Sequence, residues 1–78
     1  MVKVTLYSGN KCPHCKNAKA YLQQQKIPFV EMNVDSNRRA AKTLQSLGAR
    51  GVPFLVIGDQ TVAGFNPKQI RSAYDQQR

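Results

Sequence analysis

The sequence predicts an α/β fold with the element order βαβαββα, and three observations carry this prediction. Segments with a period of two and many β-branched residues alternate with segments whose apolar residues recur at helical spacing. A whole helix separates the first two strands, which favours parallel pairing through a right-handed crossover. A tight turn joins the last two strands, which favours a hairpin. We therefore expect a four-stranded mixed sheet flanked by three helices.

The length of 78 residues and a hydrophobic content of 41% predict one domain spanning residues 1–78. This length is close to the lower limit for a core that holds without help. No apolar run is long enough to span a bilayer. Residues 1–4 carry one charge and read as the start of a strand, without the apolar region and cleavage site of a signal peptide. We expect a monomer in the cytoplasm with no membrane partner.

The first half of the chain predicts a strand, a helix and a second strand. Residues 2–7 alternate between apolar and polar side chains. From Pro13 to about Gln25 the apolar side chains follow helical spacing. Ile27-Pro28 closes this helix, because proline disfavours helical backbone in the residue before it. Residues 29–34 then form the second strand.

A second helix follows, with Asp35 or Ser36 as the expected N-cap and Gly48 as the C-terminal stop. Its apolar residues should lie on one face: Ala40, Ala41, Leu44 and Leu47. The almost wholly apolar run at 54–57 is typical of a central strand that is buried on both sides. Gly58-Asp59 then turns the chain into a return strand.

The return strand covers residues 60–63, and a last helix begins after Asn66-Pro67. Asparagine suits the N-cap, and proline suits the first helical position because its fixed φ and missing N–H cost nothing there. The chain contains no repeat, linker or low-complexity tail.

Both cysteines lie in the stretch Lys-Cys-Pro-His-Cys-Lys at residues 11–16. Pro13 at the first helical position makes Cys12 the N-cap and puts Cys15 in the first turn. The free amides and the positive end of the helix dipole favour a thiolate at Cys12, while Cys15 is better shielded. Cys12 is therefore the expected nucleophile and Cys15 the resolving thiol. A disulfide that closes so short a loop adds little stability, so stability is not its expected purpose.

The charges beside the cysteines support the same interpretation. Lys11 and Lys16 flank the helix start, where a cation costs roughly 0.3–1 kcal/mol of helix stability but favours a thiolate. A protonated His14 would act in the same direction. The alternative is that these lysines are ordinary solvated surface.

The formal net charge of +8 makes an acidic partner plausible. The basic residues are dispersed along the chain and are not interleaved with aromatic ones, and no helix-turn-helix, zinc-finger or RNA-recognition signature occurs. We therefore expect no specific nucleic-acid binding. Steering of acidic proteins or anionic thiols explains the charge better.

Three patterns resemble those of one protein family. Cys-Pro-His-Cys at 12–15 follows the first strand, Gly-Val-Pro at 51–53 precedes the third, and Ala-Gly-Phe at 63–65 follows the fourth. Together they resemble a glutaredoxin, a small protein with the thioredoxin fold, and the resemblance covers essentially the whole chain. It implies that Pro53 is cis and faces the cysteines, and that the backbone of Val52 pairs with the incoming thiol compound. The residues by themselves leave open a trans proline at a strand start.

The departures from that family concern glutathione. Gly51 stands where many glutaredoxins have threonine, Asn66 where they have aspartate, and Gly9 near a lysine that helps to bind glutathione. Residues 63–67 are instead similar to the Ser-Gly-Phe-x-Pro of NrdH-type redoxins, which take electrons from thioredoxin reductase and reduce ribonucleotide reductase. Cys-Pro-His-Cys is closer to glutaredoxins than to the Cys-Val-x-Cys of those redoxins. The resemblance thus leaves two electron sources, glutathione as a cosubstrate or thioredoxin reductase, and implies no tightly bound cofactor.

The chemistry inferred is thiol–disulfide exchange on disulfide-containing proteins or glutathione adducts. The Cys12 thiolate attacks the target disulfide, and Cys15 then attacks the Cys12 sulfur and releases the reduced target. Phe65 is either a hydrophobic docking residue or the lid of the last helix. The expected substrate-binding residues are Lys11, Pro13, His14, Gly51, Val52, Pro53, Gly64, Phe65 and Asn66.

Other functions remain as alternatives. His14 could shift the dithiol toward oxidant or reductant, and we favour a reductant because the chain reads as cytoplasmic. Zinc bound through Cys12, Cys15 and His14 would lack a fourth ligand within one chain. An iron–sulfur cluster bridged between two molecules is the remaining metal hypothesis. An inert interaction module is disfavoured by the placement of the cysteines.

Overall fold

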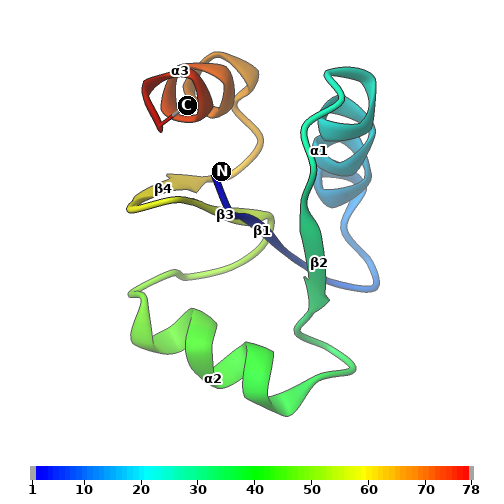
Figure 1. Cartoon of the computed structure of the whole chain (residues 1–78). Helices are drawn as coiled ribbons and strands as arrows, with labels where there is room; N and C mark the ends of the chain where they lie inside the picture. The colour runs from blue at the N-terminus through cyan, green and yellow to red at the C-terminus, as the bar shows by residue number, and fades with distance from the viewer. Residues whose placement is uncertain (1, 78) are drawn as a thin grey trace.

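The computed structural model describes residues 2–77, so Met1 and Arg78, which the predicted domain includes, lie outside the described residues. Its elements follow the predicted order βαβαββα (Figure 1). They are β1 Val4–Ser8, α1 Pro13–Gln24, β2 Val30–Asn33, α2 Arg38–Ser46, β3 Phe54–Ile57, β4 Gln60–Ala63 and α3 Pro67–Gln77. Within 2–77, no helix has both the length and the apolar character needed to cross a membrane.

The four strands form one mixed sheet in the order β2-β1-β3-β4. β1 pairs with β2 in parallel, with Leu6 opposite Glu31. β3 runs antiparallel to both β1 and β4, so Leu55 lies between Leu6 and Val62. The parallel crossover and the hairpin are therefore confirmed, and the two central strands are those with the most apolar sequences.

The helices cover both faces of the sheet, with α1 and α3 on one side and α2 on the other (Figure 1). The larger core lies against α1 and α3, and Leu6, Leu55 and Ile57 have no exposed surface in it. The smaller core lies against α2 and contains Tyr7 and Phe54. Side chains of consecutive residues point to opposite faces of a strand. Because β1 and β3 are covered on both faces, their side chains alternate between the two cores.

Helix α1 ends at Gln24, before Ile27-Pro28 as predicted, and local hydrogen bonds close its last turn. Lys26 takes a left-handed conformation with φ of 56°, and its N–H donates to the carbonyl of Gln23 at 3.1 Å. The N–H of Ile27 then donates to the carbonyl of Leu22 at 2.9 Å. This pair of bonds satisfies two of the carbonyls that have no partner within the helix.

The predicted N-cap of α2 is wrong, because the helix begins later. Asn37 is the N-cap, and its Oδ1 accepts the N–H of Ala40 at 3.1 Å. Asp35 and Ser36 instead belong to the turn that follows β2, in which both of their N–H groups donate to the side chain of Asn33. Three consecutive capping residue types compete at this point, and only the turn geometry decides between them.

The C-terminal end of α2 follows the prediction in part. Gly48 has φ of 79° and donates its N–H to Gln45, so it ends the helix as expected. Leu47 is 42% exposed, however, and does not lie on the buried face with Ala40 and Leu44. It is the C-cap residue, where the helical periodicity that predicted its burial stops.

The last two elements are also as predicted. Gly58 occupies the first central position of the hairpin turn with φ of 60°. Asn66 caps α3 by accepting the N–H of Gln69 at 3.2 Å, and Pro67 is the first helical residue. Residues 64–66 thus carry the chain from the sheet to α3 beside the loop that precedes β3.

Candidate redox site

The two cysteines lie at the start of α1 and are joined in a disulfide, with their Cα atoms 5.2 Å apart. Cys12 is the N-cap, with the extended backbone angles φ −135° and ψ 97°, and Pro13 opens the helix. Cys15 lies in the first turn and is only 4% exposed, whereas Cys12 is half-buried. The predicted positions of both cysteines are confirmed, and only Cys12 is open to an incoming partner.

A hydrogen bond distinguishes the two sulfurs further. The N–H of Cys15 donates to Sγ of Cys12 at 3.2 Å, so the cysteine side chain takes the place that an oxygen normally occupies in an N-cap. When the disulfide is reduced, the same donor and the positive end of the helix dipole favour negative charge on Cys12. Cys12 is thus the sulfur whose thiolate the fold supports.

The basic side chains at the helix start are all exposed. Lys11, His14 and Lys16 face solvent, and the first turn of α1 contains no acidic residue. In water each cation contributes only a screened interaction with a nearby charge. The backbone N–H and the helix dipole are therefore the stronger supports for a thiolate at Cys12.

The Val52–Pro53 peptide bond is cis, as the resemblance implied. Pro53 is buried and leads directly into β3, and its carbonyl accepts the N–H of Gly64 at 2.9 Å. This bond ties the loop before β3 to the end of β4. Two segments that are separated in sequence thereby become neighbours on one surface.

A groove of about 370 Å³ opens along these two segments. It brings together four of the predicted binding residues, Gly51, Val52, Pro53 and Gly64. Arg50 also lines the groove and is the charged residue among its described lining, although the sequence analysis did not single it out. The sequence signal that could have identified Arg50 is its position directly before the Gly-Val-Pro pattern.

Phe65 and Asn66 lie beyond this groove and make structural contacts. The Phe65 ring meets the Tyr21 ring of α1 edge to face, with centroids 6.1 Å apart and planes at 65°. Phe65 is also packed against the larger core, and Asn66 caps α3. These contacts match the lid alternative for Phe65, and a substrate contact by either residue stays a prediction.

A hydrogen-bonded cluster outside the predicted site holds the loop before Cys12. The N–H of Asn10 donates to Oδ2 of Asp35 at 2.7 Å, and the side-chain amide of Asn33 donates to Oδ1 of Asn10 at 2.9 Å. The sequence pattern does not predict this cluster, because it indicates a helix cap at Asp35 or Ser36. The cluster joins the loop between β1 and α1 to the turn that follows β2.

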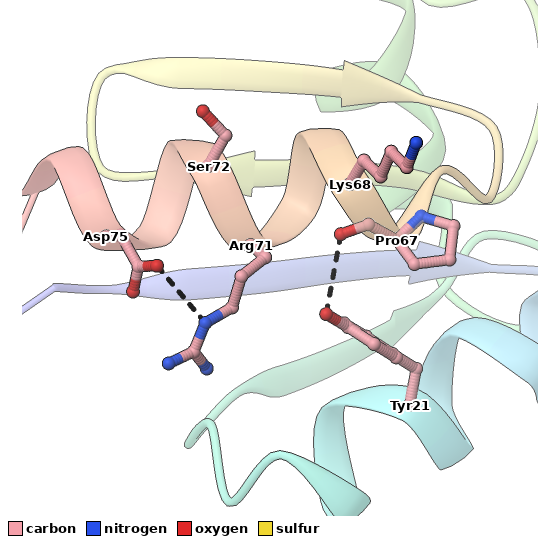
Figure 2. A pocket seen from close by; sticks show the side chains of 6 residues that line it. All are labelled: Tyr21, Pro67, Lys68, Arg71, Ser72 and Asp75. Carbon is pink, nitrogen blue, oxygen red and sulfur yellow. Dashed lines mark hydrogen bonds and ion pairs between the residues drawn. The ribbon is translucent and has the colours of Figure 1, made fainter.

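A second cavity, of about 460 Å³, lies between α1 and α3 (Figure 2). The hydroxyl of Tyr21 donates to the carbonyl of Pro67 across it at 3.4 Å, and Arg71 pairs with Asp75 along α3 at 3.2 Å. Lys68 and Ser72 complete the lining, which includes neither cysteine. The cavity shares no described lining residue with the groove beside Pro53, whose lining also contains neither cysteine.

The metal alternative can be compared with the side chains present. Within residues 2–77, no three His, Cys, Asp or Glu side chains come together as a cluster that could hold a metal ion. Cys12, Cys15 and His14 accordingly do not form a closed set of zinc ligands within one chain.

The decisive comparison is with a model of the glutaredoxin family, which matches residues 4–62 and so spans both cysteines and the cis-proline loop. This chain belongs to the glutaredoxin family. It is a thiol–disulfide oxidoreductase with a Cys12/Cys15 dithiol. The predicted fold, family and general activity are confirmed.

Relatives within this family include proteins with the name NrdH. The glutaredoxin-like protein NrdH of Lactococcus lactis is 33% identical over 67 residues, which cover 86% of this chain and 93% of the relative. The NrdH protein of Escherichia coli is 32% identical over 69 residues, covering 88% and 85% of the two chains.

Solved structures agree with the fold. The NrdH-redoxin of Escherichia coli, a glutaredoxin-like protein described as having a thioredoxin-like activity profile, superimposes with a TM-score of 0.83 and 31% identity, covering 90% of this chain and 92% of that one. The thioredoxin-like protein BC3987 gives a TM-score of 0.86 at 24% identity, covering 90% and 97%, and this likeness concerns the fold alone.

Proposed function

We propose that this glutaredoxin-family protein reduces disulfides in other proteins, with Cys12 as the attacking thiolate and Cys15 as the resolving thiol. The single observation that carries the assignment is the asymmetry of the pair. Cys12 is accessible and its sulfur accepts the N–H of Cys15, whereas Cys15 is buried behind it. A nucleophile must reach its target, so the accessible sulfur attacks first.

The exchange proceeds in two steps that together transfer two electrons. The Cys12 thiolate attacks one sulfur of the target disulfide, and the other target sulfur leaves as a thiolate that takes up a proton. Cys15 then gives up its proton and attacks Sγ of Cys12, which releases the second target sulfur as a thiol. The protein is left with the Cys12–Cys15 disulfide, the state that the structure describes.

The groove beside Pro53 is the proposed binding site for the target chain. Gly51, Val52 and Gly64 line it with little side-chain bulk, which lets an extended segment approach the backbone closely. Lys11, Pro13 and His14 would border the target on the α1 side, since they surround Cys12 in sequence and are exposed. Phe65 and Asn66 act in this proposal by holding the start of α3.

A second proposal concerns the electron source, for which thioredoxin reductase is the better candidate than glutathione. The position near which glutaredoxins carry a glutathione-binding lysine is Gly9 here. A Cβ atom at Gly9 would lie 3.1 Å from Oδ2 of Asp35 and 3.2 Å from Cγ2 of Val52, so a lysine would require its neighbours to shift. The relatives with the name NrdH support the same choice, and ribonucleotide reductase would then be the first target to test.

The test measures NADPH consumption with insulin as the disulfide substrate, in two parallel reactions. One contains glutathione and glutathione reductase, and the other contains thioredoxin reductase. We expect turnover in the second reaction. Turnover only in the first would reject the proposed electron source while leaving the exchange chemistry intact.

The exchange chemistry has a test that needs no reductase. The protein is reduced with dithiothreitol, separated from it, and mixed with insulin. We expect insulin thiols to appear while Cys12 and Cys15 become oxidised in equal amount. If the reduced protein forms no insulin thiols, the proposed function is wrong.

A further inference from the structure

We propose that Asp35 is a positioning residue for disulfide exchange, because its carboxylate holds the loop that sets the backbone of Cys12 against the cis-proline loop. This inference rests on the proposed attack by Cys12. Asp35 lies in the turn after β2 and is exposed, and its sequence neighbours predict only a helix cap. Its role follows from a contact across 25 positions of the chain.

The contact is directed at the backbone of the cysteine loop. Oδ2 of Asp35 accepts the N–H of Asn10 at 2.7 Å, two positions before Cys12. Asn33 supports the same loop by donating its side-chain amide to Oδ1 of Asn10 at 2.9 Å. Asn33 also accepts the N–H of Asp35 at 2.8 Å, which fixes the position of the carboxylate. A hydrogen bond that a backbone N–H donates to a charged acceptor is stronger than one between neutral groups.

This arrangement leaves the cysteine loop little freedom. Ser8, at the end of β1, is 2% exposed, and its carbonyl accepts the N–H of Val34 at 2.9 Å. Helix α1 begins at Pro13, so only four residues, 9–12, connect a fixed strand to a fixed helix. The bond to Asp35 acts in the middle of that connection and therefore controls how Cys12 presents its sulfur.

Gly9 links the same carboxylate to the substrate groove. The Cβ position at Gly9 lies 3.1 Å from Oδ2 of Asp35 and 3.2 Å from Cγ2 of Val52. Asp35 and Val52, the residue before the cis-proline, therefore both approach the cysteine loop at Gly9.

The charge of Asp35 and its hydrogen bond act on Cys12 in opposite directions. The negative charge disfavours a thiolate nearby, whereas the hydrogen bond keeps Cys12 in the capping geometry in which the Cys15 N–H favours one. Two variants separate these effects. Asp35→Asn removes the charge and keeps an oxygen acceptor, while Asp35→Ala removes both.

The experiment follows alkylation of Cys12 by iodoacetamide in the reduced protein, from pH 4 to pH 9, by mass spectrometry of its peptide. The basic residues next to Cys12 in sequence, Lys11, His14 and Lys16, and Arg50 in the groove are unchanged in both variants. We expect Asp35→Ala to have a higher alkylation midpoint than Asp35→Asn. We also expect pre-reduced Asp35→Ala to reduce insulin about threefold to tenfold more slowly than pre-reduced Asp35→Asn. A difference of this size corresponds to the loss of one good hydrogen bond.

Asp59→Ala is the matched control. Asp59 is also an exposed aspartate that accepts a side-chain hydrogen bond, from Gln77, but it lies at the turn between β3 and β4. We expect its alkylation profile and insulin rate to equal those of the unchanged protein. Thermal unfolding of all three variants separates a loss of stability from a change at Cys12.

Equal alkylation profiles and equal insulin rates for Asp35→Ala and Asp35→Asn would overturn the inference, because the hydrogen bond would then have no effect on Cys12. The alkylation readout does not depend on any disulfide substrate. If the unchanged protein reduces no insulin while the two variants still differ in alkylation, the positioning role stands and the proposed function fails.

Discussion

At the scale of single residues, the difference between the two cysteines leads to the first prediction. Cys12 is reachable and is supported by the Cys15 N–H, and Cys15 is 4% exposed. Cys12→Ser should lower insulin reduction to the rate without protein, because a hydroxyl does not form the required anion near pH 7. Turnover close to that of the unchanged protein would show that Cys15 attacks first. Circular dichroism of the variant serves as the control for folding.

The companion variant tests the second step. In Cys15→Ser, Cys12 can still attack, but no internal thiol follows to release the target. We expect a stable mixed disulfide with the target protein, seen as a reductant-sensitive band on a non-reducing gel. If Cys15→Ser turns over repeatedly with glutathione present, glutathione performs the resolving step in its place.

At the scale of the elements, the N-terminus of α2 provides a test of a corrected assignment. Asn37 caps the helix through its side chain, whereas Ser36 belongs to the preceding turn. Asn37→Ala should lower the free energy of unfolding by about 1 kcal/mol. Ser36→Ala is the control and should stay within about 0.5 kcal/mol in the same urea titration. The reverse order of the two effects would restore Ser36 as the cap.

The C-terminus of α1 predicts a stabilising change. Lys26 holds φ of 56°, a left-handed conformation that costs an L-residue about 1–2 kcal/mol and costs glycine much less. Lys26→Gly should therefore raise the free energy of unfolding by about 0.5–1 kcal/mol. Gln25→Gly, at a position with φ of −82°, should not raise it. An equal effect of the two changes would mean that the left-handed turn does not strain the unchanged protein.

The ends of the helices show how far local sequence patterns predict the elements. The predicted start of α3 is correct, because the Asn66-Pro67 capping signal and the helical spacing of the apolar residues indicate the same position. Around 35–37 three good caps follow one another, so local chemistry does not select the start of α2. Leu47 has the right spacing for burial but lies past the last helical residue, and it is exposed.

At the scale of the whole molecule, one sheet carries two cores on a short chain, which leaves little reserve of stability. Leu55 lies in the centre of the sheet with no exposed surface. Leu55→Ala should lower the free energy of unfolding by about 2–5 kcal/mol, with an unchanged denaturant slope. Leu47→Ala, at a 42% exposed position, should cost less than about 1 kcal/mol. Similar losses at both positions would mean that the central strands do not dominate stability.

The candidate site joins residues from four connections of the fold, and the sequence predicts them unequally. Cys12, Pro13 and Cys15 are adjacent in the chain, so the helix start alone determines their arrangement. The groove lies beside the Pro53–Gly64 bond, and the resemblance to a family anticipated Gly51, Val52, Pro53 and Gly64 among its lining residues but not Arg50. No local pattern connects Asp35 to Asn10.

By itself the sequence determined the order of the elements, the cap position of Cys12 and the shielding of Cys15, because these depend on periodicity and on bonds within a few residues. Only the tertiary structure decided that Asp35 contacts the cysteine loop, that Phe65 packs on Tyr21, and that Asn37 caps α2. The physical reason is that such contacts arise from strand order and helix placement. A polar side chain with several possible local partners takes the one that the assembled sheet brings within reach.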